Sequence, residues 1–123
     1  PSVNLQAYSL ETVIAEKFHT MLDRDEYNSR MKDFFDCYQL LTKRELDDVT
    51  LYDAIKATFD NRELEYNPKL KLFTAEFVND ANRQMQWKLF LRKIQWKEEL
   101  SFNVVMQVIT DRLKPMAEKY WNK

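Results

Sequence analysis

One lysine and two aspartates are placed in this sequence where they could do chemistry. Lys17 lies between Ile14 and Met21 in the apolar stripe of a predicted helix, where a solvated lysine is not expected. Asp33 and Asp36 are three residues apart, so both carboxylates share one side of the next predicted helix. An ammonium beside such carboxylates can bind a phosphate while a carboxylate orients or deprotonates an attacking hydroxyl.

Each of these placements also has a plainer explanation. The four-carbon stem of Lys17 can cross the edge of the core and carry the ammonium to water. Asp33 and Asp36 lie with Ser29 opposite the apolar side of their helix, where acidic residues near a helix start complement its dipole. If the two helices pack antiparallel, Lys17 could approach this acidic side. The residues alone leave both interpretations open.

The composition limits what else the chain can do. Its 19 Lys and Arg against 20 Asp and Glu give a net charge of -1, so nothing attracts the whole chain to nucleic acid or to an anionic membrane. None of the 123 residues is glycine, which disfavours tight turns, hairpins and Gly-rich phosphate loops together. One cysteine and one histidine cannot complete a zinc site, and no metal site is expected in this chain.

The lone cysteine and the lone histidine are predicted to be structural. Cys37 has no partner for an internal disulfide and is expected to be a packed, reduced thiol. His19 falls off the apolar stripe and has no Ser or Cys at a spacing that suggests a triad, so it should be structural or face solvent. The sequence has no apolar run long enough for a membrane span and no secretion signal, so we expect a cytoplasmic protein without a membrane partner.

These residues must be positioned by helices, because most of the chain has helical periodicity. With 45% hydrophobic residues and no sign of a linker or repeat, residues 1–123 are expected to form a single all-α domain. It should be a helical bundle of about five helices with a short extended N-terminal lead-in. The expected elements are the lead-in over residues 1–8, a helix of about residues 10–23, and a second helix that follows a cap at residue 28 or 29 and ends at about residue 42. A third helix from residue 50, a loop over residues 61–71, a helix of about residues 75–94 and a last helix from residue 101 should follow.

Capping residues mark where these helices begin. Short polar side chains precede each apolar run and can accept a hydrogen bond from a backbone N–H of the first turn. The expected N-caps are Ser9, Asn28 or Ser29, Thr50, Thr74 and Ser101. Pro115 lacks a backbone N–H, so it should kink or restart the last helix.

The helix of residues 75–94 is expected at the centre of the bundle because it is so apolar. Its stripe comprises Phe77, Ala81, Met85 and Leu89, widened by Trp87, Phe90, Leu91 and Ile94. The basic residues Arg83, Lys88, Arg92, Lys93 and Lys97 are interspersed with Trp87 and Trp96. Such a set could bind phosphates and stack bases, but the nearby acids dilute it, and a solvated helix face is the alternative.

Two segments resemble the C-terminal signature of the AbiEii/AbiGii-type nucleotidyltransferase toxin family. Residues 8–19 (YSLETVIAEKFH) contain its Ala-Glu-Lys helix, and residues 28–36 (NSRMKDFFD) contain a Lys-Asp-x-x-Asp motif that begins fifteen residues after the lysine. Weaker similarity continues through residues 58–62 and 86–91, so the resemblance covers most of the chain.

The resemblance implies an enzyme that moves a nucleoside monophosphate from an NTP to an acceptor, tRNA for some members, in a toxin–antitoxin or phage-defence system. By the same resemblance, Lys17 would contact the triphosphate, and Asp33 or Asp36 would support the acceptor nucleophile. Arg30 and Lys32 would contact phosphate. Many relatives have Arg where Lys32 stands, and a lysine lacks the bidentate fork of that arginine.

The metal-binding half of the family is missing from this sequence. In that half, a Gly-Ser segment followed by an Asp-x-Asp pair holds Mg²⁺ against the NTP phosphates, and a chain without glycine has no such segment. We therefore expect the C-terminal portion of a longer nucleotidyltransferase, inactive alone and holding neither Mg²⁺ nor NTP alone. The expected partners are the N-terminal domain, an antitoxin protein and a tRNA acceptor. The competing hypothesis is a noncatalytic helical module whose aromatic and basic surfaces bind an antitoxin or another protein.

Overall fold

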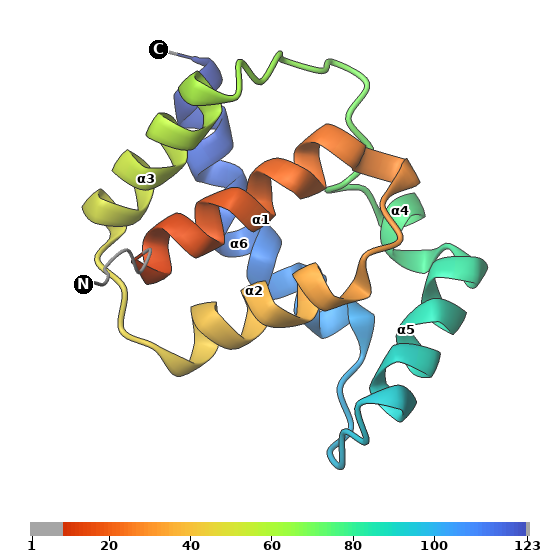
Figure 1. Cartoon of the computed structure of the whole chain (residues 1–123). Coiled ribbons are helices and arrows are strands. Elements are labelled where there is room, and N and C mark those ends of the chain that lie inside the picture. Colours follow the sequence, from red (N-terminus) through yellow and green to blue (C-terminus); the bar gives the residue numbers. More distant parts are fainter. Residues whose placement is uncertain (1–8, 123) are drawn as a thin grey trace.

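A computed structural model describes residues 9–122 and contains only helices and connecting segments in that range (Figure 1). The predicted helical bundle is confirmed, whereas the lead-in over residues 1–8 lies outside the described residues. The elements are α1 (Leu10–Arg24), the short 3-10 helix η1 (Asp25–Tyr27), α2 (Met31–Lys43), α3 (Asp48–Asn61), α4 (Ala75–Asn79), α5 (Ala81–Lys93) and α6 (Phe102–Trp121). None of the described helices is long and apolar enough to cross a bilayer.

Helix α1 lies in the middle of the bundle and begins where the sequence predicts. Ser9 caps it, accepting a hydrogen bond from the backbone N–H of Thr12 at 3.1 Å. Figure 1 shows α2 running back along α1, α3 beside it and α6 behind both. The buried side of α1 comprises Ile14, Ala15, Phe18, His19, Met21 and Leu22. Most of the apolar stripe predicted for this helix is therefore core.

The segment after α1 holds a distant loop in place. Asp25 is buried, at 8% exposure, and has a φ of 49°. Its carboxylate accepts hydrogen bonds from the backbone N–H of Lys71 at 3.0 Å and of Leu72 at 2.8 Å. These bonds fasten the predicted loop, which joins α3 to α4, onto the end of α1.

Two helix starts differ from the prediction. Helix α2 begins at Met31 after Arg30, and instead of capping it the Asn28 side chain accepts from the Arg30 N–H at 2.9 Å. Helix α3 begins two residues before Thr50, because Asp47 caps it by accepting from the Thr50 N–H at 2.9 Å. A carboxylate in this position satisfies one of the free N–H groups of the first turn.

The predicted helix of residues 75–94 is wrong, because the chain breaks there into α4 and α5. Thr74 caps α4, and Asp80 leaves the helical conformation to cap α5, accepting from the Arg83 N–H at 2.9 Å. The break changes which side of α5 is buried. Met85 and Leu89 are 54% and 51% exposed rather than core residues. Helix α5 lies at the edge of the bundle, not at its centre (Figure 1).

The last helix, α6, continues through Pro115 to Trp121, so it does not restart there. Proline removes a bond to the carbonyl of Asp111, and both residues are exposed, so water can satisfy that carbonyl. The N-cap Ser101 is confirmed by its bond from the Val104 N–H at 3.1 Å. The predicted face of α6 is also confirmed: Phe102, Val105, Ile109 and Leu113 are fully buried.

Cys37 is fully buried in α2, as the sequence predicts. Burial raises the pKa of its thiol to about 12, because a thiolate would lose its hydration there. A thiol in this state is a packing residue and not a nucleophile.

Candidate functional site

The ammonium of Lys17 is held between the two aspartates of α2. Its Nζ lies 3.2 Å from Asp33 Oδ1 and 3.2 Å from Asp36 Oδ2. The Lys17 side chain is only 22% exposed, and it lies where α1 packs against α2. The stem therefore carries the charge across the core edge to two carboxylates rather than to open water.

Asp33 is not on a solvated outer face, which corrects one of the two interpretations open to the sequence. It is 6% exposed, because the α1 side that carries Lys17 covers it. Arg30 Nε lies 3.1 Å from its second oxygen, Oδ2. On the next turn, Lys32 Nζ lies 2.6 Å from Asp36 Oδ2. The order Arg30, Asp33, Lys17, Asp36, Lys32 makes a row of alternating charges, called here the charge network.

The charge network keeps Lys17 protonated. Partial burial lowers the pKa of Lys17, but the hydrogen bonds and charges of Asp33 and Asp36 outweigh burial, so the pKa lies above its ordinary value of 10.5. A lysine in this state cannot accept a proton at neutral pH. It can act only as a fixed cation, the role that a phosphate-binding lysine has.

The outer ion pairs of the charge network contribute little to stability. Arg30 and Lys32 have side chains that are 55% and 75% exposed, and exposed ion pairs contribute about 0 to 1 kcal/mol each. Three cations against two carboxylates leave one excess positive charge, and the two outer cations are open to solvent. An anionic ligand can therefore reach the network at either end.

The described residues do not fit a magnesium ion by themselves. Residues 9–122 contain no group of three or more His, Cys, Asp or Glu side chains that could hold a metal ion. Asp33 and Asp36 both bind the Lys17 ammonium, so a cation already lies between the two carboxylates. Any Mg²⁺ for this chemistry needs ligands from elsewhere.

His19 takes no part in the charge network. It is 8% exposed and its ring lies 6.3 Å from that of Phe59. Burial is the main cause that lowers the pKa of His19 below 6.5, and the charge of Arg62 adds to it. The residue is thus a neutral part of the core edge at neutral pH.

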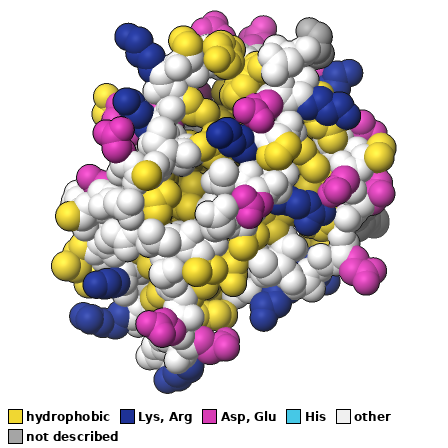
Figure 2. All heavy atoms as spheres, turned by 180° about the vertical axis from the view of Figure 1, so that it is seen from behind, with side chains coloured by type: hydrophobic (Ala, Val, Ile, Leu, Met, Phe, Trp, Pro, Cys, Tyr) yellow, Lys and Arg dark blue, Asp and Glu magenta, His cyan; other side chains and the backbone are white. Residues whose placement is uncertain are grey.

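The basic and aromatic set that could have formed a nucleic-acid surface is only half exposed. Arg83 is buried and donates to the backbone oxygens of Phe77 at 2.9 Å and Glu26 at 2.7 Å, so it joins α5 to the rest of the chain. Trp87 is buried too and donates to the Leu100 carbonyl at 2.8 Å. Lys88, Arg92, Lys93 and Lys97 remain exposed. On the face seen from behind Figure 1, Lys and Arg are interspersed with Asp and Glu rather than gathered in one patch (Figure 2).

Comparison with known proteins identifies the family. A family model described as the nucleotidyl transferase AbiEii toxin of a type IV toxin–antitoxin system matches residues 1–108. No curated protein and no solved structure matches the chain. The matched range includes all five residues of the charge network. The chain therefore belongs to the AbiEii family of nucleotidyl transferase toxins.

Proposed function

We propose that this chain is the C-terminal helical part of a nucleotidyltransferase, inactive without the N-terminal domain that completes its site. It contributes Lys17, Asp33 and Asp36 to the transfer of a nucleoside monophosphate from an NTP to an acceptor such as tRNA. The observation that supports this role is the lysine ammonium held 3.2 Å from each of two carboxylates. A lysine at the core edge that is held by two carboxylates is better explained as a residue positioned to bind phosphate than as a solvated surface residue.

Lys17 binds the triphosphate in this proposal. Its raised pKa keeps it charged, and its position on a helix fixes where that charge lies. Arg30 and Lys32, at the exposed ends of the charge network, hold further phosphate oxygens of the NTP or the acceptor. Fixed charges of this kind stabilise the charge that develops on the transferred phosphoryl group.

Asp33 or Asp36 acts on the acceptor. When the NTP phosphate engages Lys17, one carboxylate becomes free to accept a hydrogen bond from the acceptor hydroxyl. The hydroxyl oxygen then bonds to the α-phosphorus, its proton passes to the carboxylate, and pyrophosphate leaves as its bond to that phosphorus breaks. Magnesium, held by the N-terminal domain in this proposal, would neutralise the phosphate charge during that step.

Calorimetry of NTP and Mg²⁺ binding tests the division of the site between two parts. The titrations are made on this chain and on the full-length product of its reading frame. We expect binding only by the longer protein, because the described residues lack a metal site. Tight binding by this chain alone would contradict the division, and binding by neither protein would contradict the enzymatic proposal.

The outer side of α5 supports a second candidate function, a protein-binding module. Met85 and Leu89, one helical turn apart, are 54% and 51% exposed, and Ile94, just after the helix, is 40% exposed. The exposed basic residues beside them, which take part in none of the ion pairs found among residues 9–122, are Lys88, Arg92, Lys93 and Lys97. Exposed aliphatic side chains, which cannot stack on bases, favour a protein partner over a nucleic acid. The basic residues beside them favour an acidic protein, such as an antitoxin.

Leu89→Glu should weaken binding of the cognate antitoxin at least about tenfold, the loss of about 1.4 kcal/mol. The substitution places a carboxylate among exposed apolar side chains and repels an acidic partner. Isothermal titration calorimetry of the purified antitoxin with the unchanged protein and with each variant measures this loss of affinity. Val104→Glu is the matched control, because Val104 is 49% exposed on α6. An equal affinity for both variants would remove α5 as the interface.

A further inference from the structure

A groove apart from the charge network lies between the α3–α4 loop and the C-terminal half of α6. It has a volume of about 510 Å³, within the range of sites for small organic ligands. Its aromatic walls are Tyr66 and Phe73 from the loop and Trp121 from α6. None of the residues of the charge network lines it. We call this cavity the Trp121 groove.

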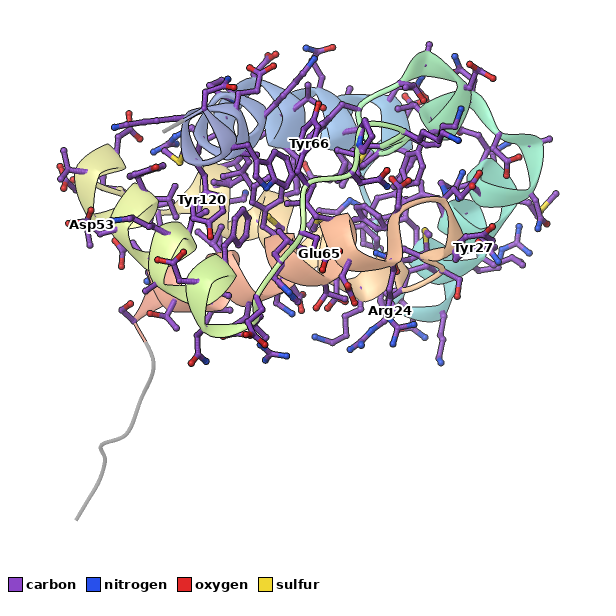
Figure 3. The ribbon with its side chains drawn as sticks, turned by 90° about the horizontal axis from the view of Figure 1, so that it is seen from above. Arg24, Tyr27, Asp53, Glu65, Tyr66 and Tyr120 are labelled. Atoms are coloured by element: carbon purple, nitrogen blue, oxygen red, sulfur yellow. The ribbon has the colours of Figure 1, made fainter. Side chains whose placement is uncertain are left out.

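The aromatic rings of the Trp121 groove form a supported platform. Tyr66 meets Trp121 edge to face, with ring centroids 5.3 Å apart at 72°. Trp121 in turn stacks on the buried Phe59 at 6.4 Å and 27°. Tyr66 is nevertheless 63% exposed and lies beside α6 in the view from above (Figure 3). A planar ligand can therefore stack on Tyr66 without disturbing the core.

Two charged side chains lie in the same groove, one helical turn apart on α6. The Lys114 ammonium is 5.9 Å from the centre of the Phe73 ring and takes part in none of the ion pairs found among residues 9–122. Glu118 is exposed and also lines the groove. The groove is thus lined by a ring surface, a cation and a carboxylate.

We propose that the Trp121 groove binds a nucleotide whose base carries an exocyclic amine. The base stacks on Tyr66, the amine donates to the Glu118 carboxylate, and Lys114 binds the phosphate. A cationic ligand fits less well, because Lys114 already places a positive charge over Phe73. The base can come from a free mononucleotide or from the end of an RNA strand. This site does not depend on the nucleotidyl transfer proposed above.

Fluorescence quenching of Trp121 by AMP tests the proposal on this chain. We expect saturable quenching by AMP, weaker quenching by UMP, which has no exocyclic amine, and none by ribose 5-phosphate. Trp121→Phe should remove the signal while keeping a ring in place. Tyr66→Ala should weaken AMP binding by about fivefold to a hundredfold, the range for losing one stacked base. Lys114→Ala should weaken AMP but leave adenosine unchanged.

Matched variants separate the groove from general surface effects. Tyr27→Ala removes a more exposed tyrosine, labelled well away from Tyr66 in Figure 3, and Lys119→Ala removes a nearby lysine outside the groove. Both should bind AMP normally. Tighter binding of a short adenylate strand than of AMP would assign the groove to an RNA end, and equal binding to a free nucleotide. Unchanged AMP affinity in Tyr66→Ala, or equal binding of ribose 5-phosphate and AMP, would overturn the proposal.

Discussion

Lys17→Met in the full-length protein should reduce nucleotidyl transfer by about a hundredfold to a thousandfold, the usual loss when one fixed charge is removed from a developing oxyanion. Methionine keeps the apolar stem that crosses the core edge, so the substitution removes the charge rather than the packing. Single-turnover transfer of a labelled nucleoside monophosphate to the acceptor measures the loss. Because the pKa of Lys17 is raised above 10.5, the loss should be constant across the neutral pH range.

Controls separate this catalytic loss from unfolding. In Lys17→Met, Asp33 keeps Arg30 and Asp36 keeps Lys32 as ion-pair partners, so the unfolding free energy should fall by about 1 to 3 kcal/mol, the usual cost of leaving a buried polar group without one partner. Lys56→Met, an exposed lysine on α3, should transfer normally. Asp33→Asn should lose activity in the same way as Lys17→Met. Normal transfer in both Lys17→Met and Asp33→Asn would rule out the charge network as part of the active site.

The helices that could be predicted from the sequence are those whose caps and periodicity agree. Ser9 and Ser101 both precede apolar runs at helical spacing, and each caps the helix that follows. Local signals of this kind need no knowledge of distant residues. The buried faces of α1 and α6 followed from the same spacing.

The helix of residues 75–94 could not be predicted because two local signals conflict at Asp80. The apolar spacing of Phe77, Met85 and Leu89 continues across it, which favours one helix. Aspartate is also a strong N-cap, and here capping decides the outcome: Asp80 bonds to the Arg83 N–H and starts a new helix. Arg83 then turns inward to the oxygens of Phe77 and Glu26, a long-range contact that periodicity does not reveal.

The two candidate sites also differ in how far local sequence signals could predict them. The charge network could be anticipated because a lysine in an apolar stripe is a local anomaly, and a single helix-to-helix contact completes it. The Trp121 groove could not be anticipated, because Tyr66 and Phe73 lie in a polar loop with no regular spacing. Contacts with distant residues, among them the bonds from Asp25 to the backbone of that loop, fix its course near α6.

Asp25→Ala should lower the unfolding free energy by about 2 to 4 kcal/mol. The substitution leaves the N–H groups of Lys71 and Leu72 without their acceptor, and an unsatisfied buried group costs about 1 to 3 kcal/mol. Alanine also tolerates a φ of 49° less well than aspartate does. Urea unfolding followed by circular dichroism measures the change.

Asp23→Ala, an exposed carboxylate two residues earlier, is the matched control and should change the unfolding free energy by less than about 0.5 kcal/mol. Asp25→Asn keeps one acceptor oxygen, so its loss should lie between the two. If Asp25→Ala and Asp23→Ala are equally stable, the loop is held by burial of Leu72, which is fully buried, and by the contact of Phe73 with Phe18. In that case the wall of the Trp121 groove depends on apolar packing rather than on hydrogen bonds to one carboxylate.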